Sequence, residues 1–182
     1  EVLNQVKGSP CKVGAQNMDY RDSGAFTGEI APPMLTAMAV QYVLIGHSER
    51  RQFFGETNES VNLKVKAALA HGLVPVMCVG ELLEQREQGL TDSVVKEQVV
   101  KGLAGIAATD AAKVVVAYEP VWAIGTGLTA SLGQIVAMHE KIRACLLEKL
   151  GSSCTISILY GGSVKADNAS DILSLSEVDG VL

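Results

Sequence analysis

Short apolar runs that are typical of buried β-strands recur along the chain. Several are nearly continuous in apolar residues, which is the pattern of a parallel strand covered on both faces rather than of a half-exposed strand. Their starts lie 24 to 42 residues apart, about the length of one strand-plus-helix unit. We expect strands at Cys11–Ala15, Tyr42–Ile45, Val74–Val79, Lys113–Tyr118, Thr155–Tyr160 and Asp179–Leu182.

Helical periodicity fills the segments between these runs. Ser131–Leu150 is the clearest case, because its apolar residues recur at three- and four-residue spacing. The same spacing predicts helices in Asn58–His71 and Asp92–Leu103. Regular alternation of strands and helices implies an α/β fold with a parallel sheet. Because no linker or shift in composition divides the sequence, we expect a single domain over residues 1–182.

The barrel and the doubly wound sheet share this alternation. A dinucleotide-binding doubly wound sheet would carry a G-x-G-x-x-G motif after a strand, and the sequence has none there. Unusual residues instead follow several expected strands directly; these are Gln16, Asn17, His47, Glu81, Glu119 and Gly161–Ser163. In a barrel all such positions meet on one rim, where the active site is built. The sequence therefore favours a (β/α)8 barrel, of which about six strands are recognisable.

Composition and charge narrow the possible partners. The chain is 48 % hydrophobic and 19 % charged, with 15 basic and 20 acidic side chains and a formal charge of -5. This balance argues against binding to nucleic acid or to a membrane surface, which requires clustered Lys and Arg. An anionic substrate stays compatible with it, because backbone amides at helix N-termini bind phosphate. With no leader or membrane-length apolar run, we expect a cytoplasmic protein.

The four cysteines do not form a metal-binding pattern. None of them pairs with another at C-x-x-C spacing, so a zinc site is not expected. Three lie in apolar, strand-like or helical surroundings, and buried free thiols are the preferred interpretation.

Glu119 directly follows the apolar residues 114–118, so a carboxylate lies at the end of a buried strand. A glutamate in this position is more often solvated or a helix cap. Here, however, Pro120 fixes the adjacent backbone, and the glycine-rich segment Ala123–Gly127 is suited to close over a ligand. A carboxylate shielded by a moving lid has the features of a general base.

His47 lies between Gly46 and Ser48 at the end of another expected strand. A strand-end histidine is more often structural than catalytic. Ser48 suits the N-cap of a helix, and a helix N-terminus beside the ring would disfavour the imidazolium. The resulting neutral imidazole can donate a hydrogen bond to a carbonyl that is becoming an enolate. The other two histidines, His71 and His139, fall in expected helices, and we expect both at the surface.

The segment Tyr160-Gly161-Gly162-Ser163 ends one strand and is expected to open a helix. Glycines there let the backbone approach an anion, toward which the following amides point. A tight strand-to-helix turn without any ligand is an equally good interpretation of this motif alone.

Several segments together resemble the triosephosphate isomerase family. Tyr118–Gly127 reads YEPVWAIGTG and is similar to the family's catalytic base and closing loop, and Ile45–Arg51 reads IGHSERR and is similar to its electrophile segment. Further similar segments follow the family order over essentially the whole chain; these are Val13–Asn17, Gly24–Glu29, Val76–Glu81 and Leu159–Val164.

The resemblance implies an activity as well as a fold. It implies an isomerase of glycolysis and gluconeogenesis that interconverts dihydroxyacetone phosphate and D-glyceraldehyde 3-phosphate through an enediolate, with no metal or organic cofactor. It implies a TIM barrel and a cytoplasmic homodimer in which the loop Asn17–Glu29 enters the partner subunit. Thirteen residues that include Phe26 are too many for a purely solvent-exposed excursion to be the better interpretation of this loop.

The resemblance also assigns roles to individual residues. Glu119 corresponds to the base that moves the proton, His47 to the neutral electrophile, and Glu49 to an additional active-site carboxylate. Three further residues would contribute to the phosphate site through their amides, and these are Gly125, Gly162 and Ser163.

The sequence departs from the family pattern in three respects. Only strands three to eight of the eight family strands are recognisable, without the early Asn-x-Lys segment and the late Gly-Gly turn. Leu128 takes the lid-hinge position where the family often has lysine. A polypeptide of these 182 residues alone is therefore expected to be inactive.

Two alternative functions follow from these departures and from the fold. An inactive fragment or pseudoenzyme would act only through protein contacts. Another phosphate-binding barrel, such as an aldolase, would need a strand-end lysine for a Schiff base. Lys12, Lys113 and Lys165 lie at strand starts or past a turn, which disfavours the aldolase.

Overall fold

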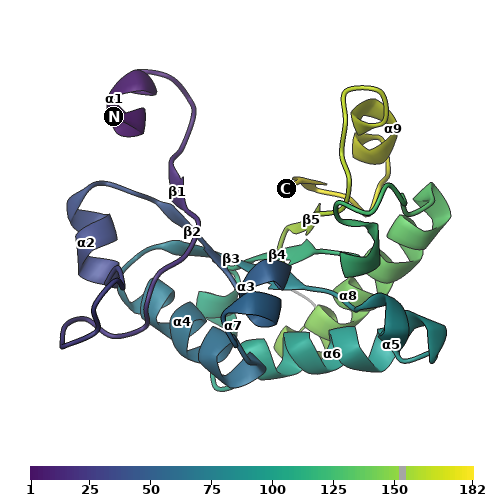
Figure 1. Cartoon of the computed structure of the whole chain (residues 1–182), viewed down its shortest axis with the longest axis horizontal. Coiled ribbons are helices and arrows are strands. Elements are labelled where there is room, and N and C mark those ends of the chain that lie inside the picture. Colours follow the sequence, from purple (N-terminus) through teal and green to yellow (C-terminus); the bar gives the residue numbers. More distant parts are fainter. Residues whose placement is uncertain (152–154) are drawn as a thin grey trace.

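One sheet of six parallel strands forms the centre of the computed structural model, which describes residues 1–151 and 155–182. The strands follow the chain order, from β1 beside β2 to β5 beside β6, and the sheet curls into half a barrel (Figure 1). They span β1 Gly14–Ala15, β2 Tyr42–Ile45, β3 Val74–Val79, β4 Val115–Tyr118, β5 Ile158–Tyr160 and β6 Gly180–Val181. All six lie within the expected runs, so the predicted parallel α/β architecture is confirmed.

Helices connect successive strands, as parallel pairing requires. They span α1 Val2–Gln5, α2 Pro32–Ala37, α3 Ser48–Phe53, α4 Asn58–Ala70, α5 Leu83–Glu87, α6 Thr91–Gly102, α7 Ala108–Ala111, α8 Leu132–Leu150 and α9 Ala169–Leu173, with a 3-10 turn, η1, at Val121–Ala123. Reciprocal capping bonds define where two of the long helices begin. Thr57 and Ser60 form a capping box at α4, and Ser131 and Gln134 form one at α8.

The three long helices cover one face of the sheet. Figure 1 shows α4, α6 and α8 side by side beneath the strands. Each helix buries an apolar stripe, represented by Val61 on α4, Val99 on α6 and Ile135 on α8, all fully buried. The main core therefore lies between the helices and the sheet.

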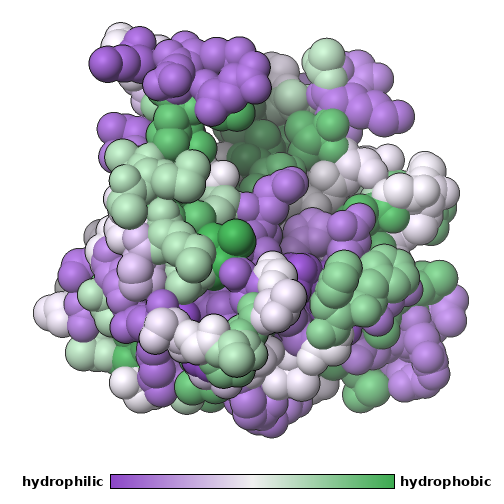
Figure 2. Space-filling model, turned by 60° about the vertical axis from the view of Figure 1, so that its left-hand side comes forward, coloured by the Kyte–Doolittle hydropathy of each residue, from purple (hydrophilic) through white to green (hydrophobic). Residues whose placement is uncertain are grey.

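The other face of the sheet carries a smaller apolar cluster. Val76, Cys78 and Ala117 are buried there, and neighbouring side chains such as Leu44 and Leu159 pack against them. Met77 and Val79 alternate with these residues and belong to the core on the helix side, so β3 is buried on both faces, as its apolar run predicts. Figure 2 shows a hollow lined by hydrophobic surface between two hydrophilic arms of the molecule.

The prediction that His139 lies at the surface is wrong. His139 is fully buried on α8 and contacts the Tyr118 ring edge-on, with centroids 6.1 Å apart. It lies four residues after Ile135 and three before Ile142, on the stripe that faces the core. His71 is partly buried, with Nε2 3.2 Å from a carboxylate oxygen of Asp22.

The cysteine prediction holds for part of the set. Cys78 and Cys145 are buried free thiols, whereas Cys11 is exposed and Cys154 lies outside the described residues. Burial raises the pKa of both Cys78 and Cys145, so these two thiols stay protonated.

Within the described part of the chain no helix is both long and apolar enough to cross a membrane.

Candidate functional site

The carboxyl ends of β2 and β4 bring His47 and Glu119 into direct contact. Nε2 of His47 lies 2.9 Å from Oε1 of Glu119, and the backbone N–H of Ser48 donates to Oε2 of Glu119 at 2.9 Å. Both carboxylate oxygens are therefore engaged. Glu119 is 2 % exposed, whereas the His47 side chain is 27 % exposed, so the pair opens to solvent on the histidine side.

The ring of His47 is held in one tautomer. The backbone N–H of Glu49 donates to Nδ1 at 3.3 Å, so Nδ1 is the acceptor and Nε2 carries the proton toward Glu119. His47 itself is thus the N-cap of α3, and the expected N-cap Ser48 is instead its first helical residue. The reason is that the imidazole reaches the free amide of the first turn, which leaves the Ser48 amide for Glu119.

The electrostatics of His47 differ from the sequence expectation. The hydrogen bond to the Glu119 carboxylate raises the pKa of His47, and burial of the ring opposes this. The prediction considered only the helix N-terminus, whereas the largest cause of the raised pKa is the hydrogen bond from Nε2 to the Glu119 carboxylate.

Two glycines leave room for Glu119. A Cβ atom at Gly80 would lie 1.7 Å from the Glu119 carbonyl oxygen, so no larger residue fits there without moving the backbone. A Cβ atom at Gly161 would lie 3.0 Å from Cγ of Glu119. Gln98 on α6 fixes Gly80 by accepting from its N–H at 2.7 Å and donating to its carbonyl at 3.0 Å. Gly80 and Gln98 were not identified from the sequence, because only the approach of β3 to β4 reveals them.

The segment after Glu119 begins as an anchored turn and continues as an exposed loop. Trp122 in η1 donates its indole N–H to Oε1 of Glu81 at 2.9 Å, and Tyr118 donates its hydroxyl to the same carboxylate at 3.1 Å. Glu81 is fully buried and also pairs with Arg86. Residues 125–129 are exposed, and Gly125 has a φ of 68° that favours glycine. The loop is thus anchored at its start through Glu81 and exposed to solvent beyond it.

The Tyr160–Ser163 turn meets the same rim but does not open a helix. The next helix, α9, starts only at Ala169, so the expected helix N-terminus at this turn is not present. Ser163 instead donates its hydroxyl to the carbonyl of Ala123 at 2.7 Å, which joins the turn to the segment after Glu119. A Cβ atom at Gly162 would lie 2.2 Å from the Tyr160 hydroxyl, so a larger residue there would have to displace the Tyr160 side chain.

Glu49 and the candidate Schiff-base lysines lie at the margin or away from this centre. The Glu49 side chain is 69 % exposed, with its carboxylate 4.0 Å from Nδ1 of His47. Lys12 and Lys113 precede β1 and β4, and Lys165 lies past the turn; all three are exposed. Of the six residues singled out from the sequence, His47, Glu119, Gly162 and Ser163 gather on one rim, Glu49 borders it, and Gly125 lies in the exposed loop.

Comparison with known proteins identifies the family of the chain. The family model described as triosephosphate isomerase matches residues 1–182. The triosephosphate isomerase of Clostridium perfringens (strain SM101 / Type A) is 51 % identical over 183 residues, which cover all of this chain and 74 % of the relative. Those of Solibacter usitatus and Acetivibrio thermocellus are also 51 % identical, with 74 % and 73 % of their lengths covered. The chain belongs to the triosephosphate isomerase family.

Proposed function

We propose that the protein interconverts dihydroxyacetone phosphate and D-glyceraldehyde 3-phosphate in glycolysis and gluconeogenesis. The observation that carries the proposal is the contact of Nε2 of His47 with Oε1 of Glu119, at the carboxyl-end rim of the strands, where barrel enzymes build their active sites. This contact pairs a carboxylate with a proton donor, and proton transfer beside a carbonyl requires both.

Glu119 is the proposed base. Its carboxylate takes a proton from the carbon beside the substrate carbonyl and returns it to the former carbonyl carbon, while the hydroxyl proton passes from one substrate oxygen to the other, so that no net proton is gained or lost. The carboxylate must first leave Ser48 and His47, which hold it in this arrangement. Because Pro120 and η1 follow Glu119 directly, movement of the loop and movement of the base are mechanically linked.

His47 is the proposed electrophile. Its Nε2–H can donate to the carbonyl oxygen while negative charge develops on that oxygen in the enediolate. When Glu119 turns to the substrate, His47 loses the contact that raises its pKa and keeps the Glu49 amide on Nδ1. The ring then favours the neutral form, which matches the family chemistry of a neutral histidine acting as an electrophile.

The remaining site residues are proposed to bind the substrate. The amides of Gly125, Gly162 and Ser163 would hold the phosphate once the loop closes over it. The bond from Ser163 to the Ala123 carbonyl supports this, because it already joins the turn to the loop segment. Glu49 is the proposed additional carboxylate beside the imidazole.

We further propose a cytoplasmic homodimer that forms through the loop Asn17–Glu29, with residues 1–182 in a single domain. Phe26 in this loop is 39 % exposed, and the Arg21 guanidinium lies over its ring at 3.2 Å. Phe53 and Phe54 at the end of α3 are each more than 60 % exposed. Exposed aromatic residues of this kind are enriched at protein interfaces.

A coupled assay with D-glyceraldehyde 3-phosphate tests the function. The intact mass of the assayed protein should be measured first, because the chain itself accounts for 19.1 kDa. A protein heavier than 19.1 kDa is expected to turn over, whereas the 182-residue polypeptide alone is expected to be inactive. In the active protein we expect Glu119→Asp to lower kcat by about a hundredfold, because shortening the side chain withdraws the carboxylate by roughly 1 Å. The matched control is Glu140→Asp, at an exposed position of α8 away from the rim.

Three results would count against the proposal. Unchanged turnover in Glu119→Asp would remove this residue from the role of base. No turnover in a folded protein heavier than 19.1 kDa would favour the pseudoenzyme that acts through protein contacts. A covalent adduct trapped by borohydride would revive the aldolase instead.

A further inference from the structure

We propose that Arg51 is a positioning residue that fixes the peptide before His47 against the end of β3 and so aims the imidazole at Glu119. The inference rests on the proposed isomerase function for its kinetic consequence, but its structural consequence can be measured separately. The hydrogen bonds of Arg51 go to neither Glu119 nor the imidazole, so its contact with the site is through the backbone before His47. Its charge also interacts with Glu119, and a lysine at this position keeps that charge while removing the fork.

The guanidinium of Arg51 joins three elements at the rim. Nε donates to the carbonyl of Gly46 at 2.9 Å, Nη1 to the side-chain oxygen of Asn58 at 2.9 Å, and Nη2 to the carbonyl of Cys78 at 3.3 Å. Gly46 follows β2, Asn58 begins α4, and Cys78 lies in β3. One side chain from α3 thus links the end of β2 to its neighbouring strand and to the next helix.

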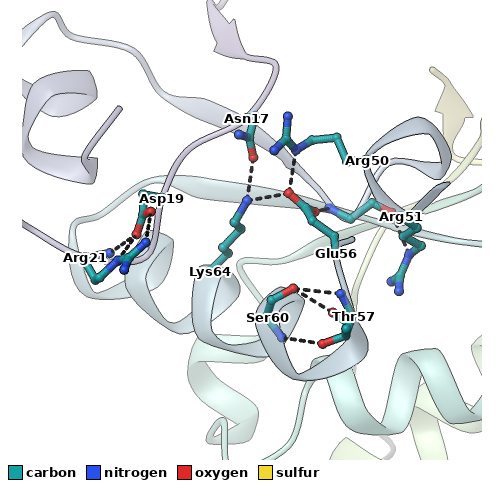
Figure 3. A network of polar contacts seen from close by, with 10 residues as sticks. Asn17, Asp19, Arg21, Arg50, Arg51, Glu56, Thr57, Ser60 and Lys64 are labelled. Carbon is teal, nitrogen blue, oxygen red and sulfur yellow. Dashed lines mark hydrogen bonds and ion pairs between the residues drawn. The ribbon is translucent and has the colours of Figure 1, made fainter. Parts of the chain in front are cut away.

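The partners of Arg51 are neutral, which distinguishes it from the adjacent arginine. Arg50 pairs with the Glu56 carboxylate, and Lys64 connects that carboxylate to Asn17. Figure 3 shows Arg51 pointing away from this group. Desolvation lowers the pKa of Arg51, so its placement has an electrostatic cost that two carbonyls and an amide offset only in part. A planar fork with five donors can serve three such acceptors at once, whereas a lysine ammonium cannot match that geometry.

Both polar groups of Gly46 are held from outside the strand. Its N–H donates to Oε2 of Glu56 at 3.1 Å, and its carbonyl accepts from Arg51. Gly46 has a φ of 73°, and a Cβ atom there would lie 2.7 Å from Val61 and 3.1 Å from Nη2 of Arg51. The carbonyl of Gly46 belongs to the peptide bond that leads into His47. Fixing this peptide therefore fixes the backbone position from which the His47 side chain extends.

The consequence for catalysis follows from geometry. His47 must present Nε2 to a substrate oxygen, and a misplacement of about 1 Å can cost roughly a hundredfold in rate. Without the fork of Arg51, the Gly46 carbonyl of this peptide would lose its bond to Nε, and the Glu56 contact would hold only the preceding peptide through the Gly46 N–H. We therefore expect the loss to affect kcat more than KM, because the residues proposed to bind the phosphate, Gly125, Gly162 and Ser163, do not contact Arg51.

The test compares Arg51→Lys with Arg143→Lys. Arg143 is a matched control because it also forms a fork, but toward Glu177 and Asp179 beside β6, at the opposite edge of the sheet. We expect Arg51→Lys to lower kcat about 10- to 100-fold with KM within about twofold. We also expect the ring nitrogen resonances of His47 to shift or broaden in NMR spectra of the unliganded protein. Arg143→Lys should leave both observables unchanged.

Two outcomes would overturn the proposal. One is an Arg51→Lys protein that melts at lower temperature but keeps the kcat and the His47 resonances of the parent, which would indicate a purely structural role. The other is an equal change in Arg143→Lys. Asn58→Ala removes one acceptor of the fork and should give a smaller change in the same direction. If the parent protein shows no turnover, the proposed function fails, while the His47 resonances still decide the role of Arg51.

Discussion

The proton-bearing nitrogen of His47 and one carboxylate oxygen of Glu119 lie 2.9 Å apart, although the two residues belong to strand ends separated by β3. In this arrangement each group satisfies the other, and the Ser48 amide satisfies the second carboxylate oxygen. The two residues thus form a closed polar pair, which, under the proposed function, a substrate would have to separate before either group could act on it.

The pair makes the titration of His47 depend on Glu119. The hydrogen bond to Glu119 is the largest cause of the raised pKa of His47, so Glu119→Gln should lower that pKa. The contact stabilises the fold fully below the unfolded histidine pKa of about 6.5, and this contribution is lost as pH rises through the folded pKa. NMR titration of the His47 ring measures the effect. Glu49→Gln should produce a smaller change, and an unaltered pKa in Glu119→Gln would contradict the assignment.

We expect a side chain at position 80 to clash with the backbone of Glu119. Its Cβ position is 1.7 Å from the Glu119 carbonyl oxygen, so Gly80→Ala must push β4 and the proposed base aside. We expect a loss of about 1–3 kcal/mol in the free energy of unfolding, together with a clear fall in turnover. The control is Gly133→Ala in α8, where a Cβ atom meets open space. That change should stabilise the protein by up to about 1 kcal/mol in urea unfolding, because alanine favours a helix.

The hydrogen bond from Trp122 to Glu81 is expected to stabilise the turn η1 that begins the loop after Glu119. Trp122→Phe keeps an aromatic ring but removes the indole N–H that donates to Glu81. A hydrogen bond to a charged group contributes about 1.5–3 kcal/mol. We expect faster amide exchange in Val121–Ala123, followed by mass spectrometry, while exchange in the distant helix α4 stays the same. Equal protection of η1 in both proteins would show that the indole contact does not hold the turn.

We expect the folded protein to lose stability in acid because His139 is buried. Burial lowers the pKa of His139, whose Nδ1 lies 2.9 Å from the Glu177 carbonyl oxygen. The unfolded chain therefore takes up this proton at a higher pH than the folded protein does. The stabilisation of the folded protein by the neutral His139 is complete above about pH 6.5 and is lost as pH falls toward the folded pKa. Every tenfold difference in proton affinity between the folded and unfolded states corresponds to about 1.4 kcal/mol in the free energy of unfolding. Urea unfolding at pH 7.5 and 5.5 measures it, and His139→Gln should reduce the difference between the two.

The proposed homodimer through the loop Asn17–Glu29 can be tested at Phe26. If Phe26 is buried by a second copy of the protein, Phe26→Asp should weaken association by placing a charge in an apolar contact. Light scattering over a range of concentrations separates the two species. Leu173→Asp, at an exposed position of α9, serves as the control. A parent protein that stays monomeric at every concentration would contradict the dimer.

The strands, the long helices and the family were all predictable without coordinates. Apolar runs such as Val74–Val79 and the stripe of α8 record local periodicities, and these follow from the geometry of the backbone. The positions of His47, Glu119 and Ser163 after strands also predicted that they would share one rim. The reason is that parallel strands bring their carboxyl ends to one edge.

Which groups touch one another depends instead on packing. That His47 caps α3 with its own ring, that Tyr160–Ser163 leads into a loop instead of a helix, and that His139 is buried could not be derived from local patterns. The fork of Arg51 and the fit of Gly80 against Glu119 depend on the register of β2, β3 and β4. Local sequence carries the propensity of each segment, but distances between segments are fixed only when the sheet pairs and the helices pack, and the chemistry of the site depends on those distances.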